Sequence, residues 1–591
     1  MSYLNILLVY AAVDVIACVG LGLQVGVAGV SNLGFIVFQA AGAYVTAILA
    51  LPPQTTNFGF QRYVGGLSLP FPLPWLGAMT AGALLALPFT FLVGRRMRGD
   101  FAAIGLLVTA VLLNLLVMNY VPLFNGAAGL ANVPAPLQSV ILVSTSTGYQ
   151  YGFAFGALAL AGAAFWYVRR ITESPYGRSL RAMRDNDRVA ESLGKNLLAL
   201  RTGVLVSGGA LAALSGAILV SYIGAWDPSA WTYGETIVLF TAVIIGGSGN
   251  NVGAVLGALL VPVGFEEATR FITNNNPNLP PNLMPSLQWV AIGLLITTFL
   301  WLRPRGVLPE RKRVIPADAP GPEAQHQPAT PPVAARQADD GPALKAVGLS
   351  KDYDGVHAVA EVSLSVHRGT LTGLIGPNGA GKSTLLALLA GSVPPSAGRV
   401  IYQGRDITAL PAFRRSRIGL VRTFQLASEF KRLTVLENLL SGVPSHRGDT
   451  FLGALAGRWY WRADEAAAVG RARALLARFG LTEHANSYAG DLSGGQRRLV
   501  EIMRALMAEP QLLLLDEPMA GVHPELARTI GNALRGLCQE GMTILMVEHE
   551  LAIMDEFCDP VIVMADGAVL AEGTMTELRD RAEVVEAYLV G

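Results

Sequence analysis

The chain divides into a long apolar first half and a second half in which short apolar runs alternate with amphipathic segments. The first half holds the candidate membrane spans 4–22, 27–50, 74–94, 102–121, 150–168, 203–223 and 285–302. A helix needs roughly 20 apolar residues to cross a bilayer, and each of these segments approaches or exceeds that length. The pattern predicts an α-helical, multi-span membrane domain embedded in a lipid bilayer.

A further apolar pair, 235–247 and 252–268, is interrupted by a glycine-rich run from Gly246 to Gly253. Each part of this pair is shorter than a crossing helix. Irregular backbone at membrane depth needs protein or a water-filled cavity to satisfy its polar groups, so one interpretation is a broken, re-entrant segment. The alternative is a short cytoplasmic hairpin turn, and the sequence leaves both open.

Basic residues indicate how the spans are oriented. Arginine and lysine gather in the connections 95–98, 169–201 and 303–313, whereas the stretches 52–73, 122–149 and 224–234 contain only Arg62. Because loops rich in positive charge stay on the cytoplasmic side, we expect these three connections to be cytoplasmic. The expected location is a bacterial cytoplasmic (inner) membrane, with everything after the last span in the cytoplasm.

Composition agrees with a membrane protein and limits the partners. Hydrophobic residues make up 52% of the 591 residues and charged residues only 15%, which is too apolar for a wholly soluble chain. Lys and Arg number 44 against 43 Asp and Glu, so charge gives no reason to expect a nucleic-acid partner. Cys18, Cys538 and Cys558 form no motif, and we expect buried thiols rather than a disulfide or metal site.

Proline marks the boundary between the two halves. From about residue 310 to 342 the sequence is rich in Pro, Ala, Gln and acidic residues and has little to bury, which is typical of a flexible linker. Beyond it, strands such as 371–375 and 543–547 alternate with helices, as in an α/β fold. We therefore predict a transmembrane domain at 1–306, a flexible linker at 307–342 and an α/β domain of the P-loop type at 343–591.

The run from Gly376 to Ser383 reads G-P-N-G-A-G-K-S and matches the phosphate-loop pattern G-x-x-x-x-G-K-S/T. Its glycines let successive backbone N–H groups approach phosphate oxygens, and the following helix adds the positive end of its dipole. Lys382 can then reach the β- and γ-phosphates of ATP. An incidental glycine turn is the alternative, and the strand before the loop and the helix after it argue against that reading.

A second motif supplies acidic groups. Leu512 to Leu515 form an apolar strand that ends in Asp516 and Glu517. We expect Asp516 and the hydroxyl of Ser383 to hold Mg²⁺, and Glu517 to act on the attacking water.

The second half resembles the ABC ATPase family over 343–591. The resemblance implies that Tyr353 stacks on adenine, that Gln425 contacts Mg²⁺ and senses the γ-phosphate, and that His549 is the switch histidine. It also implies that the signature motif Leu492–Gln496 closes over the ATP of another subunit.

The ATP-binding residues so expected are Tyr353, Gly376, Asn378, Gly379, Gly381, Lys382, Ser383, Thr384, Ser493, Gly494, Gly495 and Gln496. Glu517, His549 and Gln425 are the expected catalytic residues, and Ser383, Gln425 and Asp516 are the expected metal ligands. His523 departs from the family, which usually has Asp or Asn there.

The first half resembles the permeases of branched-chain amino acid ABC transporters over most of 20–306. The resemblance rests on Tyr176–Gly194 in the largest cytoplasmic connection, on the glycines at 246–257 and on Pro304-Arg305-Gly306. Val111 and Asn114 stand where the family commonly carries Glu and Arg, so urea, amides and carboxylates remain open beside amino acids. Polar candidates for the solute path are Gln24, Asn32, Gln39, Asn114 and Asn250, and each can equally serve helix–helix hydrogen bonds.

Together these features predict an ATP-driven importer in which permease and ATPase share one chain. The resemblance implies an extracytoplasmic solute-binding protein and a second permease–ATPase half, either a second copy or a paralogue. An exporter half-transporter is the alternative within transport, although its spans are usually fewer and longer. A membrane-anchored ATPase regulator is the alternative outside transport, and the Tyr176–Gly194 motif argues against it.

Overall fold

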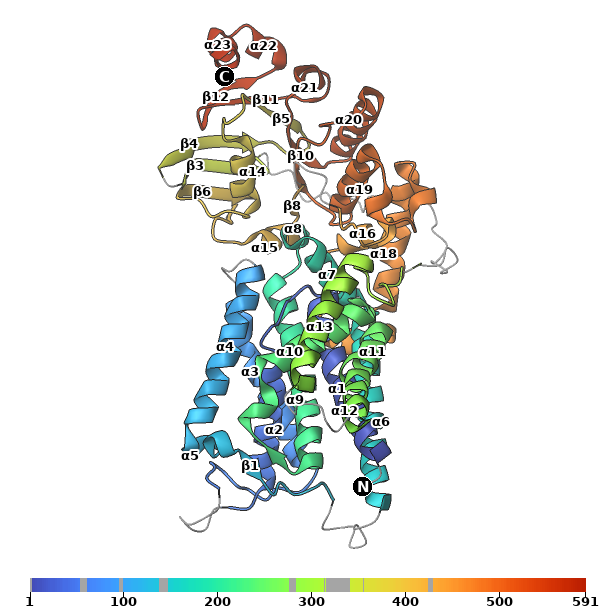
Figure 1. Cartoon of the computed structure of the whole chain (residues 1–591). Coiled ribbons are helices and arrows are strands. Elements are labelled where there is room, and N and C mark those ends of the chain that lie inside the picture. Colours follow the sequence, from blue (N-terminus) through green and yellow to red (C-terminus); the bar gives the residue numbers. More distant parts are fainter. Residues whose placement is uncertain are drawn as a thin grey trace. The chain divides into compact units, whose positions relative to one another are not determined.

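The computed structural model describes residues 3–53, 61–94, 99–137, 147–275, 283–312, 314, 341–353, 355–423 and 429–590. They form two compact units (Figure 1). Unit 1 comprises Met1–Arg184 and Leu197–Arg311, and unit 2 comprises Asp185–Asn196 and Lys312–Gly591. Unit 2 therefore includes a short segment that lies between two membrane helices in the sequence. Most of the predicted linker falls outside the described residues, so the predicted domain boundaries stay predictions.

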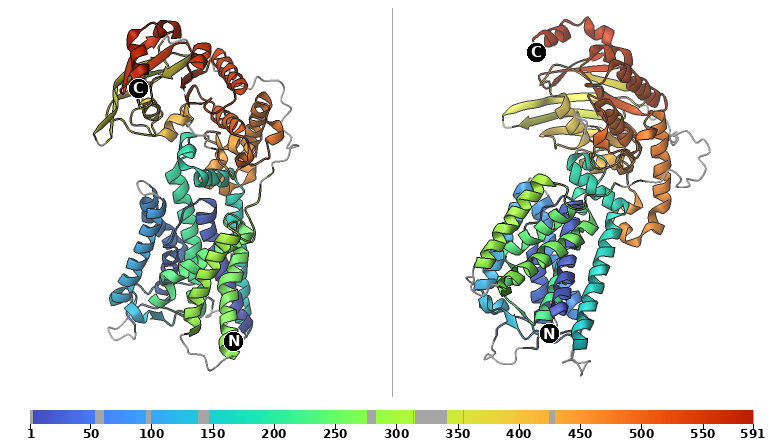
Figure 2. Two further views of the ribbon diagram at one scale, coloured as in Figure 1. Left: turned by 45° about the horizontal axis from the view of Figure 1, so that its top comes forward. Right: turned by 45° about the vertical axis from the view of Figure 1, so that its right-hand side comes forward.

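Unit 1 is helical, and its longer helices run side by side in both views of Figure 2. They are α1 (Tyr3–Gly22), α2 (Ile36–Ala50), α3 (Leu73–Gly94), α4 (Gly99–Asn119), α6 (Thr147–Thr172), α9 (Leu197–Ile223), α10 (Tyr233–Gly247), α11 (Asn251–Ala258), α12 (Gly264–Asn275) and α13 (Leu283–Leu302). The smaller elements are the π-helical turns η1 (Leu23–Val27) and η4 (Leu259–Val263), the 3-10 turns η2 (Gly126–Ala128) and η3 (Pro228–Trp231), helix α5 (Val121–Phe124), and strands β1 (Leu130–Ala131) and β2 (Ala225–Trp226). Among the described residues, six helices are long and apolar enough to cross a membrane.

The predicted span 27–50 is wrong at its start, because helix α2 begins only at Ile36. The residues between η1 and Phe35 are not helical. Gly29 has a φ of +71°, and the Oδ1 atom of Asn32 accepts the N–H of Gly34 at 3.2 Å. A local side-chain hydrogen bond thus replaces the helical one, as short amide side chains often do.

The interrupted pair is a helix–turn–helix, and the prediction that both of its parts are too short is wrong for the second part. Residues Asn251–Thr273 are long and apolar enough to cross a membrane. Pro262 lies within the π-helical turn η4, where a residue without an N–H group is tolerated. At the turn, Oδ1 of Asn250 accepts the N–H groups of Val252 and Gly253 at 3.0 and 3.3 Å and so caps α11.

Unit 2 is an α/β domain built on two sheets. The larger sheet has the strand order β12-β11-β5-β10-β9-β8, in which all neighbours are parallel except β12 and β11. Its strands are β12 (Ala568–Gly573), β11 (Val561–Ala565), β5 (Leu371–Ile375), β10 (Thr543–Val547), β9 (Leu512–Asp516) and β8 (Leu420–Arg422). The smaller, antiparallel sheet consists of β4 (Val356–Val366), β3 (Leu344–Tyr353), β6 (Ala397–Tyr402) and β7 (Arg405–Asp406).

The parallel strands fix where the functional motifs meet. β5, β9 and β10 are buried along their whole length and lie side by side. The phosphate loop follows β5, Glu517 follows β9, and His549 follows β10 within two residues. Because parallel strands end at the same edge, these three motifs converge there.

The helices of unit 2 are α14 (Lys382–Ala390), α15 (Ala412–Arg417), α16 (Val435–Ser441), α17 (Phe451–Ala456), α18 (Arg458–Arg478), α19 (Gly494–Leu506), α20 (Pro524–Gln539), α21 (Leu551–Phe557), α22 (Met575–Arg579) and α23 (Ala582–Val590). Helix α8 (Asp187–Ser192) also belongs to it, whereas α7 (Pro175–Asp185) belongs to unit 1 except for its last residue.

Candidate functional site

The phosphate loop has the backbone that its glycines allow. Gly376, Gly379 and Gly381 have φ values of +155°, +84° and +91°, which side-chain-bearing residues rarely adopt. A Cβ atom at Gly376 would lie 2.1 Å from the carbonyl oxygen of Met564, and one at Gly381 would lie 2.2 Å from that of Ala358. Two of the three glycines are therefore required by close packing as well as by φ.

Lys382 and Ser383 open helix α14 directly after this loop. The Nζ atom of Lys382 donates to the carbonyl oxygens of Gly376 and Pro377 at 2.8 and 2.9 Å, so the loop curls around its own lysine. Burial lowers the pKa of Lys382, while Glu517 and Asp516 oppose that shift. Ser383 and Asn378 are exposed and Thr384 is half-buried. The loop thus presents its polar groups at one edge of the sheet.

Asp516 lies beside Ser383 at the end of β9. The Ser383 hydroxyl donates to Oδ1 of Asp516 at 3.4 Å, while Arg422 donates to the other carboxylate oxygen at 2.9 Å. Arg422 is 9% exposed, so it fixes the carboxylate in a nearly water-free setting. One Asp516 oxygen therefore faces the Ser383 hydroxyl, and two oxygen donors suited to a hard cation stand together.

Glu517 has an unusual backbone conformation for a residue with a side chain, with a φ of +50°. Its N–H donates to the carbonyl oxygen of Val547 at 2.9 Å, which ties the turn to the neighbouring strand. The Nε2 atom of His549 lies 2.8 Å from Oε1 of Glu517. The structure thus brings Lys382, Ser383, Asp516, Glu517 and His549, from three motifs, to one site.

Arg498 on helix α19 holds the turn that carries Glu517, and our sequence reasoning missed it. It is 4% exposed and donates to the backbone carbonyl oxygens of Pro518 at 3.1 Å and Asp516 at 3.3 Å, and also to that of Glu517. Its charge is paired with Glu501 at 2.7 Å. A strained backbone conformation such as that of Glu517 persists where several surrounding contacts hold it in place, and Arg498 supplies such contacts.

A sequence signal for this arrangement exists. Arg498, Glu501 and Arg504 recur at intervals of three on one face of α19, and all three are buried. Charged residues on a buried helix face must be paired.

Glu548, between β10 and His549, is a second buried acid that the sequence did not single out. Its Oε1 atom accepts the N–H of Met519 at 2.6 Å, and it is 3% exposed. Burial raises the pKa of Glu548 from 4.5 to about 7, with a smaller contribution in the same direction from Glu517. A carboxyl group with a raised pKa therefore lies close to Glu517, the residue predicted to act on the attacking water.

The signature motif Leu492–Gln496 lies at the start of α19. Ser493 and Gln496 form a capping box: the Ser493 hydroxyl accepts the N–H of Gln496, and the Gln496 side chain accepts the N–H of Ser493. Gln496 also contacts His484, with 3.2 Å between the two side-chain nitrogens. Ser493 and Gly494 are exposed, which leaves the positive end of this helix open.

Tyr353 and Gln425 are the other predicted residues of the nucleotide site. Tyr353, at the end of β3, is 45% exposed and has Nζ of Lys351 5.1 Å from its ring centre. Gln425 lies outside the described residues, so its predicted role stays a prediction. His523, the departure from the family pattern, precedes the first residue of α20.

The segment Asp185–Asn196 packs within unit 2. Lys195 is 5% exposed, donates to the carbonyl oxygen of Val443 at 2.9 Å and forms an ion pair with Asp449. At the other end of the segment, Oδ2 of Asp185 accepts the N–H of Arg432 at 3.0 Å. Charged and polar contacts thus hold this loop between membrane helices against the α/β domain.

The polar candidates of unit 1 mostly bond to neighbouring segments. Gln24 donates to the carbonyl oxygen of Leu205 at 3.4 Å and accepts from Asn32 at 3.0 Å. Asn114 donates to the carbonyl oxygen of Pro228 at 2.9 Å. Gln39 is 6% exposed. These contacts support the helix–helix alternative for Gln24, Asn32 and Asn114.

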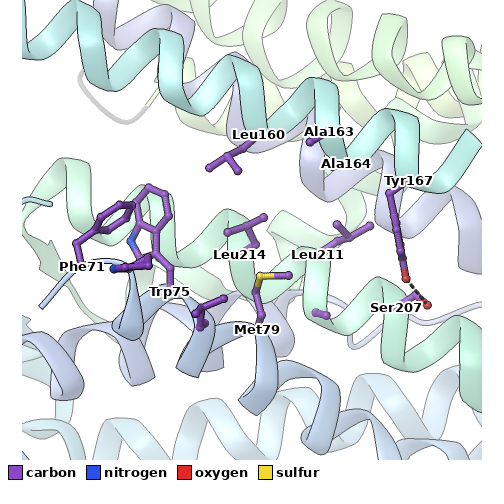
Figure 3. Close-up of a pocket in the computed structure, with 13 residues that line it drawn as sticks. Phe71, Trp75, Met79, Leu160, Ala163, Ala164, Tyr167, Ser207, Leu211 and Leu214 are labelled. Atoms are coloured by element: carbon purple, nitrogen blue, oxygen red, sulfur yellow. Dashed lines mark hydrogen bonds between the residues drawn. The ribbon is translucent and has the colours of Figure 1, made fainter. Parts of the chain in front are cut away.

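A cavity of about 450 Å³ lies between α3, α6 and α9 (Figure 3). Apolar side chains such as Trp75, Met79 and Leu214 line it, and the hydrogen bond from Tyr167 to Ser207 at 3.2 Å marks one end. A small polar solute would lose water here without gaining equivalent hydrogen bonds. We therefore do not place the solute path in this cavity.

Comparisons with known proteins match both halves. A family model described as branched-chain amino acid transport system / permease component matches residues 3–299, half of the chain. A model described as ABC transporter matches residues 359–520.

Similar proteins are known for the second half. The probable branched-chain amino acid transport ATP-binding protein LivG of Archaeoglobus fulgidus is 39% identical over 246 residues, which cover 42% of this chain and 95% of the relative. The high-affinity branched-chain amino acid transport ATP-binding protein BraF of Pseudomonas aeruginosa is 38% identical, covering 42% of this chain and 98% of the relative. A solved nucleotide-free ATP-binding cassette from an ABC transporter is 38% identical and covers 42% of this chain and 98% of its own, with a TM-score of 0.37.

Proposed function

We propose that this chain imports a small polar solute. The chain belongs to the family of permease components of branched-chain amino acid transport systems and also carries an ABC ATPase domain. The chain is a multi-pass membrane protein of an ABC importer that couples ATP hydrolysis to transport. The membrane half matches a model described as branched-chain amino acid transport system / permease component, and this match does not favour the exporter alternative.

One observation carries the proposal. The segment Asp185–Asn196 leaves the membrane half, packs within the ATPase unit and returns to the membrane half. A nucleotide-driven movement of the ATPase is therefore transmitted to the permease through this covalently continuous segment.

The residue roles follow from the site's geometry. Lys382 and the N–H groups of the phosphate loop bind the ATP phosphates, and Glu517 orients the attacking water with His549 beside it. Ser383 and Asp516 supply oxygen donors that suit Mg²⁺, and Arg422 keeps Asp516 in place. The ion would neutralise charge that develops on the phosphate oxygens. Gln425 is proposed as a further ligand by resemblance alone.

A second ATPase subunit completes the site. The exposed N-terminal end of α19 at Ser493 and Gly494 suits an anionic ligand, and in the family it faces the nucleotide of another subunit. We propose a dimer of this chain with itself or with a paralogue, fed by an extracytoplasmic solute-binding protein. The proposed location is a bacterial cytoplasmic membrane, with the ATPase in the cytoplasm.

The proposed solute class follows from the similar proteins and from two residues of the membrane half. Branched-chain amino acids come first because the similar proteins are described as their transporters. Val111 and Asn114 replace the charged pair of the family, which keeps urea, short amides and carboxylates as competitors.

Uptake into vesicles tests the proposal. Vesicles containing the assembled transporter and its binding protein should take up labelled leucine only with internal ATP, and Lys382→Ala should abolish uptake. Uptake of urea or acetamide instead of leucine would keep import and replace the solute. ATP-dependent movement of the solute in the opposite direction, out of the compartment that the ATPase faces, would contradict import.

A further inference from the structure

Four segments that lie far apart in the sequence meet at one place in unit 1. Gly26, in the π-helical turn after α1, touches the turn between α10 and α11. A Cβ atom at Gly26 would lie 2.4 Å from the backbone nitrogen of Gly249. Only glycine permits this approach, so the two helix interruptions are in direct backbone contact.

The segment after α13 packs on the same turn. The N–H of Val307 donates to the carbonyl oxygen of Ile245 at 2.7 Å, and that of Leu308 donates to Gly246 at 3.0 Å. The Asn250 side chain donates to the carbonyl oxygen of Pro309 at 3.0 Å. The last residues of the membrane half are therefore pinned to the second interruption.

Arg184 joins all of these segments. Its Nη1 atom donates to the carbonyl oxygen of Gly26 at 2.5 Å, and its Nη2 atom donates to Oε2 of Glu310 at 2.9 Å. The Arg184 side chain is 8% exposed and that of Glu310 is 20% exposed. A Cβ atom at Gly249 would lie 3.2 Å from Nη1 of Arg184, so this guanidinium also borders the second interruption.

The planar guanidinium is suited to this position. It donates in two fixed directions at once, to a backbone carbonyl on one side and to a carboxylate on the other, which a lysine ammonium does less well. Arg181 stands 4.0 Å from the second oxygen of Glu310 and adds positive charge around the same acid. Removing either Arg184 or Glu310 would leave a charge with a poorer partner in a nearly buried place.

Arg184 connects the segment that packs within unit 2 to the helix interruptions of unit 1. It is the last residue of unit 1 before the segment Asp185–Asn196, which packs within unit 2. A displacement of that segment reaches unit 1 at its two ends, Arg184 and Leu197, and the Arg184 side chain contacts the first helix interruption directly. We propose that Arg184 is a positioning residue that passes the movement of Asp185–Asn196 to the helix interruptions at Gly26 and Gly249, with Glu310 as its counter-ion.

This inference rests on the proposed function, and its test needs no knowledge of the solute. Ser31 is exposed in the non-helical stretch that follows Gly26, and the three native cysteines are buried. Ser31→Cys therefore provides a single accessible thiol for a water-soluble maleimide. Labelling is measured on the full-length assembled protein carrying Glu517→Gln, with and without ATP. Binding of a fluorescent ATP analogue is measured in parallel.

We expect ATP to change the labelling rate of Ser31→Cys. Arg184→Gln and Glu310→Gln should each reduce that change roughly tenfold, within the usual range for coupling between two sites. Arg184→Lys, which keeps the charge, should give an intermediate response. ATP-analogue binding should be unchanged in all three variants.

The control is an ion pair of the same type elsewhere in unit 1. Arg169 and Glu173 lie 2.8 Å apart, and their side chains are 58% and 55% exposed. Arg169→Gln should leave the ATP response intact, since exposed pairs contribute little.

Three outcomes would overturn the proposal. The first is an ATP response that persists in Arg184→Gln, and the second is a labelling rate that ATP never changes although the analogue binds. The third is full labelling without ATP in both Arg184→Gln and Glu310→Gln, which would show that the pair only stabilises unit 1. Loss of analogue binding in the parent protein would instead contradict the proposed function.

Discussion

The Nε2 atom of His549 lies 2.8 Å from Oε1 of Glu517, although the two residues follow different strands. The side-by-side pairing of β9 and β10 produces this contact, since Val547 is in register with Asp516. A carboxylate held by an imidazole at the edge of a phosphate site is well placed to orient water.

Glu517→Gln should therefore lower steady-state ATP hydrolysis by about 10²–10⁴-fold while leaving ATP binding intact. The amide keeps the shape of the side chain and can still contact His549, but it no longer accepts a proton. Phosphate release and binding of a fluorescent ATP analogue measure the two effects. Glu525→Gln, an exposed acid on α20, is the matched control and should change neither. Turnover at the parent rate in Glu517→Gln would contradict the assignment.

Arg498→Met should reduce kcat with little change in KM, because the turn carrying Glu517 loses its donor while the phosphate loop is untouched. Removing the guanidinium that lies 2.7 Å from the buried Glu501 should also cost about 3–5 kcal/mol of stability. The double variant Arg498→Met with Glu501→Leu separates the two effects. It should recover thermal stability, and it should not recover kcat. Recovery of both would mean that Arg498 acts only on stability.

The sequence predicted that the phosphate loop, Asp516 and Glu517 lie together, because each of these motifs is local in the chain. The phosphate loop and the strand end at Asp516 and Glu517 are contiguous, and parallel strands bring such ends together. Arg498 and Glu548 escaped because their partners are backbone groups of distant segments. A regular motif does not record such contacts.

In the membrane half, the sequence located the spans and the interruption at Gly246–Gly253, but not where α2 begins or how long the second part of the interrupted pair is. Helix α2 begins at Ile36 rather than 27, because the hydrogen bond from Gly34 to Asn32 competes with the helix. Asn251–Thr273 forms one long apolar stretch through the π-helical turn at Pro262. The hydrogen bond that delays α2 does not change mean hydropathy, so a window over the sequence does not detect it.

Glu548 should make stability depend on pH. Its pKa is about 7 in the folded protein against an ordinary value of 4.5, so the folded state binds the extra proton between these values. The contribution of Glu548 to the free energy of unfolding is therefore fully present below about pH 4.5. It is lost as pH rises through 7, and the loss amounts to roughly 3 kcal/mol. Glu548→Gln should remove this loss.

Thermal unfolding at about pH 5 and about pH 8 checks this expectation, since the two values lie on either side of the transition. The difference in unfolding temperature between Glu548→Gln and the parent protein should grow with pH in favour of the variant. Glu572→Gln, at an exposed position on β12, should show no such trend. Equal pH dependence in the parent and in Glu548→Gln would exclude Glu548 as its source.

The segment Asp185–Asn196 yields the last prediction, because two readings of its charges differ. As a positive-inside anchor, its basic residues would matter and Asp185 would not. As a coupling element, the contacts that matter are those of Asp185 with the N–H of Arg432 and of Lys195 with Asp449 and Val443. Asp185→Asn and Lys195→Met should therefore preserve basal ATP hydrolysis and lower solute uptake per ATP, by about tenfold for the buried Lys195. Arg188→Gln, at an exposed position in the same segment, should change neither quantity. Labelled leucine uptake and phosphate release in the same vesicles give the ratio directly. A normal ratio in both Asp185→Asn and Lys195→Met, with impaired membrane insertion in Arg188→Gln, would establish the anchor instead.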